Sequence, residues 1–342
     1  MSITTHERPG VYSDYDASTV ISTSGGGQTA GLVAVCAGGE AGTLYVINRY
    51  EEAVTAFGQE ENLTELVRLL LLNGAAQVRA VPVTDESGYD AAFSLLATGE
   101  NVALVLCDST DVTVQQKLRD SVSSASEARR ERIAVVCGGT EESVEDLVQR
   151  AGQLNSERVV LVAPGDDGCL LAAAVAGAIA GESDAALPLS GAELKGVSQT
   201  QAQYDDSEID TLVRGGVTPL ERVGGVVSVV RGITTRTKTG EVSDATWREL
   251  TTIRIVDDVI PTIRNALRAK FQRSKNTEQT RGAIRSQVIL ELENKLSREI
   301  ITGYENVTVQ ADAENPTVCL VEFSFTVAHG LNQIWLSAHI TV

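Results

Sequence analysis

Histidine is scarce in this 342-residue sequence. The three copies are His6, His329 and His339, so no imidazole lies between residues 7 and 328. A serine or cysteine nucleophile needs an adjacent base, which is usually a histidine. The scarcity therefore excludes the usual catalytic triad from the middle of the chain. His339 is better explained as a surface or interface residue than as a general base.

Aromatic residues and positive charge are also in short supply. Aromatic side chains make up 4% of the sequence, and the formal net charge is −18 at pH 7. We therefore expect no nucleic-acid partner, since few rings could stack on bases and the charge is of the wrong sign. The nucleotide-binding sequence GxxxxGK[ST] does not occur. The stretch Gly38–Gly42 precedes β-like residues, which favours a turn over a phosphate-binding loop, and we expect no cofactor.

Signals for metals, disulfides and membranes are missing as well. The cysteines are odd in number, scattered and without a CxxC spacing, and no HxxE or DxD pattern suggests a metal site. No apolar run approaches the roughly 20 residues that span a membrane, and residues 1–10 lack the apolar region of a signal peptide. We expect no membrane insertion, and we expect all cysteines to be reduced core residues of a protein made in the bacterial host cytoplasm: Cys36, Cys107, Cys137, Cys169 and Cys319.

Acidic residues are abundant, with 46 Asp and Glu in total. Asp108 and Asp111 follow the strand-like run Val102–Cys107, at the edge where α/β sheets often place their sites. Carboxylates in this position also cap the next helix. Capping is the interpretation that we favour.

Between residues 29 and 180, apolar strand-like runs alternate with helical patterns. The runs are continuous in Val, Leu and Ala, as expected when a parallel sheet is covered on both faces. This pattern predicts a doubly wound α/β middle region. We divide it into a small N-terminal α/β part, residues 23–98, and a core domain, residues 99–222.

The C-terminal third has a different pattern and predicts an α+β domain, residues 223–330. A long hairpin is expected from strands at 226–236 and 246–255. A helix should start at Asp257 and Asp258 with Pro261 in its first turn, because both residue types suit helix N-termini. A second helix is expected at 282–302 and ends before Gly303, and two strands at 307–311 and 317–327 complete an antiparallel sheet.

The two ends of the chain predict extended arms. Residues 333–342 alternate in polarity with the period of a half-buried strand, so the strand expected at 331–342 needs a partner. Residues 1–22 contain β-branched and aromatic residues but no helical stripe. The arm residues that we single out are Ile3, Arg8, Pro9, Gly10, Val11, Tyr12, Ile334, Trp335, Leu336, Ala338, Ile340 and Val342.

Positive charge is concentrated in one segment. Residues 231–285 contain 12 Arg or Lys and 6 Asp or Glu. Such a cluster is either a solvated helix face or a docking surface for an acidic partner, including another copy of the chain. Its central members are Arg264, Arg268, Lys270, Arg273 and Lys275.

Five stretches, in this order, resemble the sheath protein family of contractile phage tails and phage-like particles. They are Glu7-Arg8-Pro9-Gly10-Val11-Tyr12; Ser207-Glu208-Ile209-Asp210-Thr211-Leu212 with Gly216-Val217-Thr218; Val230-Arg231-Gly232-Ile233-Thr234-Thr235; Ile253-Arg254-Ile255-Val256-Asp257-Asp258-Val259; and Asn276-Thr277. The chain is similar to the compact members of that family.

The resemblance implies a structural protein with a subtilisin-like middle region and no peptidase activity. It implies that both arms enter the C-terminal domains of neighbouring copies and complete a shared sheet. It also implies that a helix of the C-terminal domain faces an inner tube, and our candidate is the helix at 259–275 with its basic residues. The expected partners are other copies in a helical sheath, the tail tube protein, and the baseplate and tail-terminator proteins. The expected location is the tail of a virion or phage-like particle, where contraction drives the tube through the target cell envelope.

Two alternatives stay open at this point. An α/β hydrolase-like or nucleotide-binding enzyme could carry a dimerising C-terminal domain. A related bacteriocin-like particle or secretion-system sleeve would use the same subunit design.

Overall fold

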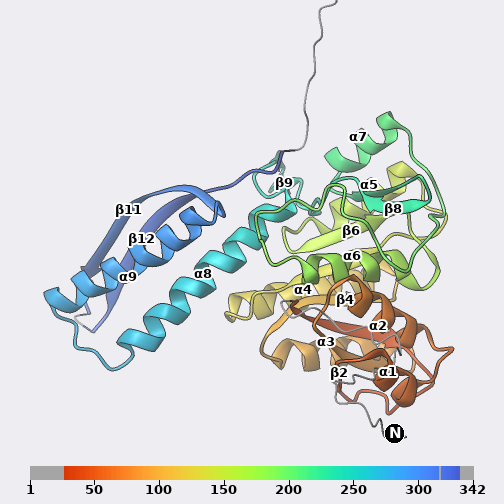
Figure 1. The fold of residues 1–342 in the computed structure, drawn as a ribbon, viewed down its shortest axis with the longest axis horizontal. Helices are drawn as coiled ribbons and strands as arrows, with labels where there is room; N and C mark the ends of the chain where they lie inside the picture. The colour runs from red at the N-terminus through yellow and green to blue at the C-terminus, as the bar shows by residue number, and fades with distance from the viewer. Residues whose placement is uncertain (1–26, 316, 332–342) are drawn as a thin grey trace, which may run out of the picture.

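The computed structural model describes residues 27–315 and 317–331. The expected N-terminal arm, residues 1–22, and the strand pattern at 333–342 lie outside these residues. The described chain forms an α/β body and a C-terminal lobe, which is made by residues 256–327 and projects from the body along helix α8 (Figure 1).

The body is built on one eight-stranded sheet in the order β2-β3-β1-β4-β5-β6-β7-β8. Neighbours from β3 to β7 run parallel, and the two outer strands are antiparallel. Val33 of β1 lies opposite Val81 of β3 and Cys107 of β4. The strand order reverses at β1, which confirms the doubly wound α/β prediction. The strands are β1 Thr29–Val35, β2 Tyr45–Ile47, β3 Gln77–Val83, β4 Val102–Cys107, β5 Ile133–Cys137, β6 Val159–Ala163, β7 Thr218–Val223 and β8 Val226–Val229.

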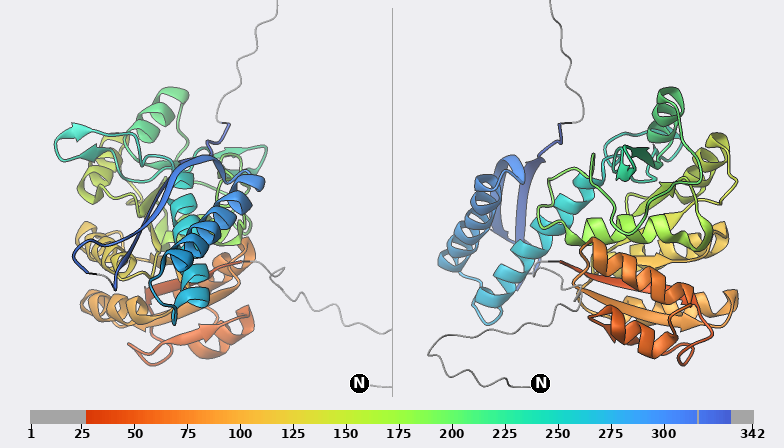
Figure 2. Two further views of the ribbon diagram at one scale, coloured as in Figure 1. Left: turned by 90° about the vertical axis from the view of Figure 1, so that its left-hand side faces the viewer. Right: turned by 45° about the vertical axis from the view of Figure 1, so that its right-hand side comes forward.

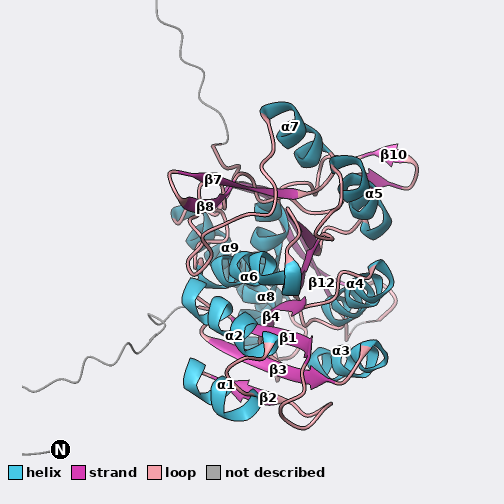
Figure 3. Cartoon of the chain, turned by 90° about the vertical axis from the view of Figure 1, so that its right-hand side faces the viewer, coloured by secondary structure: helices cyan, strands magenta, loops and turns pink. Residues whose placement is uncertain are grey.

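Helices cover both faces of this sheet (Figure 3). Alternate residues of β1 point to opposite layers: Leu32 packs in one core with α1, α2 and α6, and Val33 packs in the other with α3, α4, α5 and α7. Both faces are therefore dry, which explains the uninterrupted apolar runs. The helices are α1 Tyr50–Phe57, α2 Asn62–Asn73, α3 Tyr89–Thr98, α4 Val112–Glu127, α5 Val144–Leu154, α6 Leu170–Gly181 and α7 Asp206–Arg214, with 3₁₀ turns η1 Glu86–Gly88 and η2 Asp167–Cys169.

Helix caps follow the local sequence. The side chain of Asp111 accepts hydrogen bonds from the backbone N–H groups of Thr113 and Val114, so it caps α4 as predicted. Asp108 does not share this role. Its carboxylate accepts a hydrogen bond from the hydroxyl of Tyr89 and a 3.0 Å bond from the backbone N–H of Val35.

The large sheet contains strands from both sides of the domain boundary expected between residues 98 and 99. Strand β1 pairs with β3 on one side and with β4 on the other. Residues 226–229 also belong to this sheet, because β8 folds back on β7. The segments expected as two α/β units thus share one sheet.

The long hairpin expected from residues 226–236 and 246–255 is wrong. Strand β8 pairs with β7 around a Gly224-Gly225 turn. The two expected segments meet in one isolated bridge, Ile233 with Glu249, and a short hairpin of β9 Lys238–Thr239 and β10 Val242–Ser243 lies between them. Helix α8 spans Leu250–Phe271, so it begins seven residues before Asp257 and contains Pro261 in its interior. Ile255, Val259 and Ile263 form one buried stripe at helical spacing, which outweighs the short β-like alternation before it.

The prediction that all cysteines are reduced is wrong for two of them. Cys137 ends β5, Cys169 precedes α6, and the structure joins them in a buried disulfide. Cys36 and Cys107 are buried thiols as expected, whereas Cys319 is half-buried. The paired cysteines are 32 residues apart, and only the fold brings both to the same edge of the sheet.

The C-terminal lobe packs a helical hairpin against two long antiparallel strands (Figure 2). Helix α9 spans Glu278–Ser297, strand β11 Ile301–Ala311 and strand β12 Cys319–Val327. Helix α9 ends before the expected residue 302, and Gly303 lies within β11 rather than at the helix end. A separate apolar core joins α8, α9 and β11 through Ile263, Val288, Leu292 and Val307.

Candidate assembly surfaces

The sheet of the C-terminal lobe has two long edges. β11 has 11 residues and β12 has 9, and within residues 27–315 and 317–331 they pair only with each other. Each strand therefore presents one side of its backbone without a strand partner in the described chain. Unpaired edges of this length are the sites at which sheets recruit further strands.

One face of β12 is apolar but incompletely covered. Its burial alternates along the whole strand: Val321, Phe323 and Phe325 are half-buried against the lobe core, whereas Glu322 and Ser324 are exposed. The rings of Phe323 and Phe325 stack with centroids 6.3 Å apart. A further strand beside β12 would bury more of these side chains.

The outer edges of the large sheet have less free backbone for pairing with a further strand than the edges of β11 and β12 have. The edge of β8 is already occupied by the loop between α6 and α7. Gly191 and Leu194 donate to the carbonyls of Val229 and Val227 at 2.7 and 2.8 Å, and Val229 donates back to Ala192 at 3.0 Å. The opposite edge strand, β2, is only 3 residues long. The extended edges available for pairing thus lie in the C-terminal lobe.

Ion pairs fix the base of α8 to its surroundings; we call them the α8 clasp. Arg158, at the start of β6, contacts both carboxylate oxygens of Asp257, at 2.8 and 3.0 Å. The side chains of this pair are only 13% and 16% exposed. Lys295 of α9 reaches Asp258 at 2.6 Å, and Arg264 reaches Glu131 at 2.6 Å. These three ion pairs join two residues of the body, Glu131 and Arg158, to the helices α8 and α9.

Burial shapes the electrostatics of this clasp. Burial raises the pKa of Asp257, and the bidentate contact with Arg158 opposes that rise. Burial also acts to raise the pKa of Glu131, but the hydrogen bond from Arg264 reverses the effect and leaves this pKa below its usual value. Arg254 has a pKa lowered by burial, and its guanidinium donates to the carbonyl of Glu182 at 2.8 Å, just past the end of α6.

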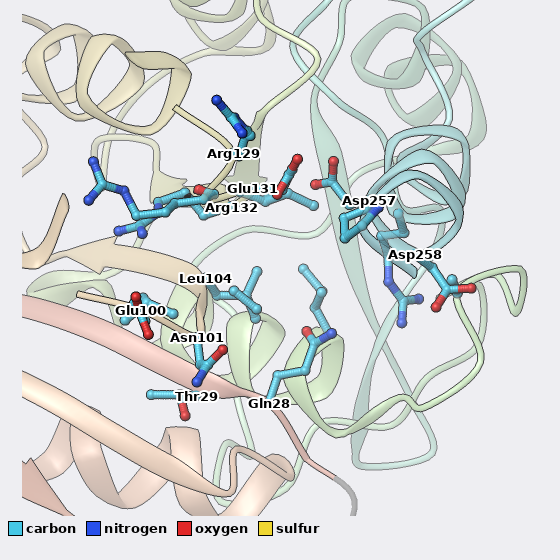
Figure 4. A pocket seen from close by; sticks show the side chains of 18 of the residues that line it. Gln28, Thr29, Glu100, Asn101, Leu104, Arg129, Glu131, Arg132, Asp257 and Asp258 are labelled. Atoms are coloured by element: carbon cyan, nitrogen blue, oxygen red, sulfur yellow. Dashed lines mark hydrogen bonds between the residues drawn. The ribbon is translucent and has the colours of Figure 1, made fainter. Parts of the chain in front are cut away.

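A polar cleft of about 660 Å³ runs between α8 and the body (Figure 4). Arg129, Glu131 and Arg132 come from the loop before β5, and Asp257 faces them from α8, where Asp258 also lines the cleft. Gln28, Thr29, Glu100 and Asn101 line the cleft at the beginnings of β1 and β4.

The five basic residues singled out from the sequence do not form one uniform surface. Arg264 belongs to the α8 clasp, and the ammonium of Lys270 donates to Gln287 of α9 at 2.5 Å. Arg268, Arg273 and Lys275 are exposed and make no ion pair within the described chain. These three are the members that could meet a partner without breaking an internal contact.

The residues considered for chemistry have structural partners. Gly38 packs against the end of α1, where a Cβ would lie 1.9 Å from the carbonyl oxygen of Phe57, so this loop does not open onto a helix N-terminus. Burial raises the pKa of Asp108, which is held by Tyr89. Burial likewise raises the pKa of Asp166 to about 6, and its carboxylate receives the backbone N–H of Leu170 at 2.7 Å. Within the described residues, no group of three or more His, Cys, Asp or Glu could hold a metal ion.

Sequence reasoning missed the α8 clasp and the occupied edge of β8. Neither has a local signal, because each joins residues at least 30 positions apart. Among the described helices, none has the length and apolar character to cross a bilayer.

Two family models match the chain. One describes the phage tail sheath protein central domain and matches residues 85–235, and the other describes the phage tail sheath C-terminal domain and matches residues 242–341. A tail sheath protein of Bacillus phage SP01 is 27% identical over 253 residues, which is 70% of this chain and 43% of that protein. The chain therefore spans less than half the length of this relative.

Solved structures show the same fold. The helical sheath of the anti-feeding prophage in its contracted state is 17% identical with a TM-score of 0.71, over 98% of this chain and 99% of that one. A chain of the baseplate of the same particle is 16% identical with a TM-score of 0.74, over 99% of this chain and 100% of that one. A sheath tail protein from Desulfitobacterium hafniense is 12% identical with a TM-score of 0.69, over 93% of this chain and 100% of that one. These relatives are sheath and baseplate proteins, and nothing among them supports the enzyme alternative.

Proposed function

Because this chain belongs to the phage tail sheath family, we propose that it is a structural subunit of a contractile sheath. In this proposal its copies polymerise helically around a tail tube and contract to drive the tube through a target envelope. The body corresponds to the subtilisin-like middle region of the family. The subunit works without catalytic residues or a cofactor, in the tail of a virion or a phage-like particle.

The observation that carries the proposal is the pair of open strand edges in the C-terminal lobe. Strands β11 and β12 are long, and the apolar face of β12 is only half-buried. We assign these edges to arms of neighbouring copies, residues 1–22 and 331–342. Five apolar side chains on the C-terminal arm would contribute roughly 5–12 kcal/mol before the cost of ordering the arm. Links of that strength would keep the sleeve connected while the bodies move.

The α8 clasp gives each subunit a defined shape. It ties the lobe to the body through Arg158–Asp257 and Arg264–Glu131. Contraction then consists of bodies rotating against one another, with the arms as the connections between them. The extended sleeve is a trapped state. The energy that drives contraction comes from new contacts between bodies, summed over many copies, and no nucleotide is needed.

The exposed end of α8 and the loop that follows it form the surface assigned to the tube. Arg268, Arg273 and Lys275 supply positive charge that suits an acidic partner. The tail tube protein is the partner proposed for this surface. The baseplate and tail-terminator proteins would bind the two ends of the sleeve.

The test uses two matched variants of the C-terminal arm. Leu336→Asp with Ile340→Asp places charge on the apolar face of the expected strand, and Ser337→Asp with Thr341→Asp places the same charge on the polar face. We expect the first variant to remain a folded monomer that forms no sleeves in electron micrographs, and the second to polymerise. Sleeves formed equally by both variants would contradict the proposal.

A further inference from the structure

Three arginines meet at one corner of the body, around Gly99. Arg132 donates from Nη2 to the carbonyl of Gly99 at 3.0 Å, from Nη1 to that of Leu96 at 2.9 Å, and from Nε to that of Arg130 at 3.1 Å. Arg79 of β3 approaches the same point, because its Nη1 lies 2.7 Å from where a Cβ on Gly99 would be. Arg79, Arg130 and Arg132 are called the arginine cluster below.

The cluster has no acidic partner within the described residues. None of the ion pairs there involves Arg79, Arg130 or Arg132. The Nε atoms of Arg79 and Arg130 are buried and have no acceptor in the described chain, as is also true of Arg236 and Arg248 elsewhere. Burial, followed by the charges of the other two arginines, lowers the pKa of Arg132 to about 10.

A shortage of carboxylates does not explain this arrangement. The chain carries 46 acidic and 28 basic side chains. Several other partly buried arginines have carboxylate partners, such as Arg150 with Glu142 and Arg158 with Asp257. Buried polar groups are almost always hydrogen-bonded, so two buried donors beside a third guanidinium indicate an acceptor from outside the chain.

The cluster can be reached from solvent. Arg130 lines the cleft beside α8 and also a second hollow of about 420 Å³, which lies between α3 and α4 and is lined by Lys117, Asp90 and Asp120 as well. Arginine forks match the spacing of oxygen atoms in phosphate and sulfate, and hydrogen bonds between such charged groups are strong. We propose that the arginine cluster binds a small multivalent oxyanion of the phosphate or sulfate class.

A bound oxyanion would join β3 to the loop between α4 and β5. That loop also holds Glu131, which anchors Arg264 of α8. The bound subunit is therefore expected to be more stable at the root of its lobe. This role is independent of the proposed sleeve, since it concerns the single subunit.

The test measures phosphate binding to the unpolymerised full chain. Isothermal titration with inorganic phosphate, at ionic strength held constant with sodium chloride, is compared for the wild type, Arg79→Gln/Arg130→Gln and Arg214→Gln/Arg222→Gln. The last variant removes two exposed positive charges elsewhere. We expect saturable binding by the wild type and by this control, and at least a tenfold loss of affinity in the cluster variant.

Two further measurements keep the test decisive. If the double variant fails to fold, Arg130→Gln and Arg130→Lys are compared, and the lysine variant should retain more affinity than the glutamine variant. Thermal unfolding should show a midpoint that rises with phosphate in every variant that binds it. No saturable binding by the wild type, or equal binding by the cluster variant and the control, would overturn the proposal. Saturable binding only to assembled sleeves would also overturn it, because the acceptor would then belong to a neighbouring copy.

Discussion

Removing the carboxylate of Asp257 should destabilise the protein strongly. Asp257 holds Arg158 through two contacts of 2.8 and 3.0 Å, and both side chains are mostly buried. In Asp257→Ala, the guanidinium of Arg158 keeps a 3.2 Å bond to the carbonyl of Arg132 but loses its only carboxylate in the described chain. A charge left buried in this way is the main source of the expected cost.

The magnitude follows from the burial of the pair. Breaking a buried ion pair by removing one partner costs about 3–5 kcal/mol. The exposed pair Arg214–Asp210 provides a matched control, because it has a comparable contact at 3.3 Å but exposures of 76% and 65%. Asp210→Ala should cost less than about 0.5 kcal/mol, since exposed helix pairs contribute little.

Urea unfolding followed by far-ultraviolet circular dichroism measures both free energies. We expect Asp257→Ala to lower the free energy of unfolding by at least 2 kcal/mol more than Asp210→Ala does, on the order expected from the burial difference. The double variant Arg158→Met/Asp257→Ala should recover part of the loss, because no unpaired charge remains. Equal costs for the two single variants would refute the claim that the clasp is a buried electrostatic link.

Two further predictions concern charge. Replacing Arg268, Arg273 and Lys275 by Glu should abolish co-sedimentation with tube protein and leave sleeve formation intact; unchanged co-sedimentation would show that these residues face solvent. Asp166 has a pKa raised to about 6 by burial, so the fold favours its neutral form, and its contribution to stability is lost as pH rises from about 4 through 6. Asp166→Asn should therefore gain about 2 kcal/mol relative to the wild type between pH 4.5 and 7.5 in urea unfolding. Parallel pH profiles of the two proteins would contradict this.

The body could be predicted well because its signals are local. Continuous apolar runs between residues 29 and 180, such as Val102–Cys107, predicted the strands of a parallel sheet, and the structure has β1, β3, β4, β5 and β6 there. Capping by Asp111 was also correct, since a cap depends on the next three residues alone.

The lobe was harder to predict for a physical reason. The start of α8 has a sequence that alternates like a strand, and only burial of Ile255 together with Val259 and Ile263 decides for a helix. The same holds for Gly303, which looked like a helix terminator but lies in a strand. Tertiary packing overrides local preference at such positions.

The candidate surfaces could also be predicted only in part from the sequence. The basic segment was visible in the sequence, but the structure shows that Arg264 and Lys270 are engaged within the chain. The disulfide between Cys137 and Cys169 had no signal in the spacing of the cysteines. Both outcomes depend on contacts between distant segments, which composition and spacing do not encode.

The central claim is that the sheet formed by β11 and β12 is completed by strands of other copies. A cryo-electron microscopy map of the assembled polymer, at a resolution that traces the chain, tests it most directly. We predict that the open edges of β11 and β12 are paired with residues 1–22 or 331–342 of neighbouring subunits. A map in which both arms fold back onto their own subunit would contradict the account.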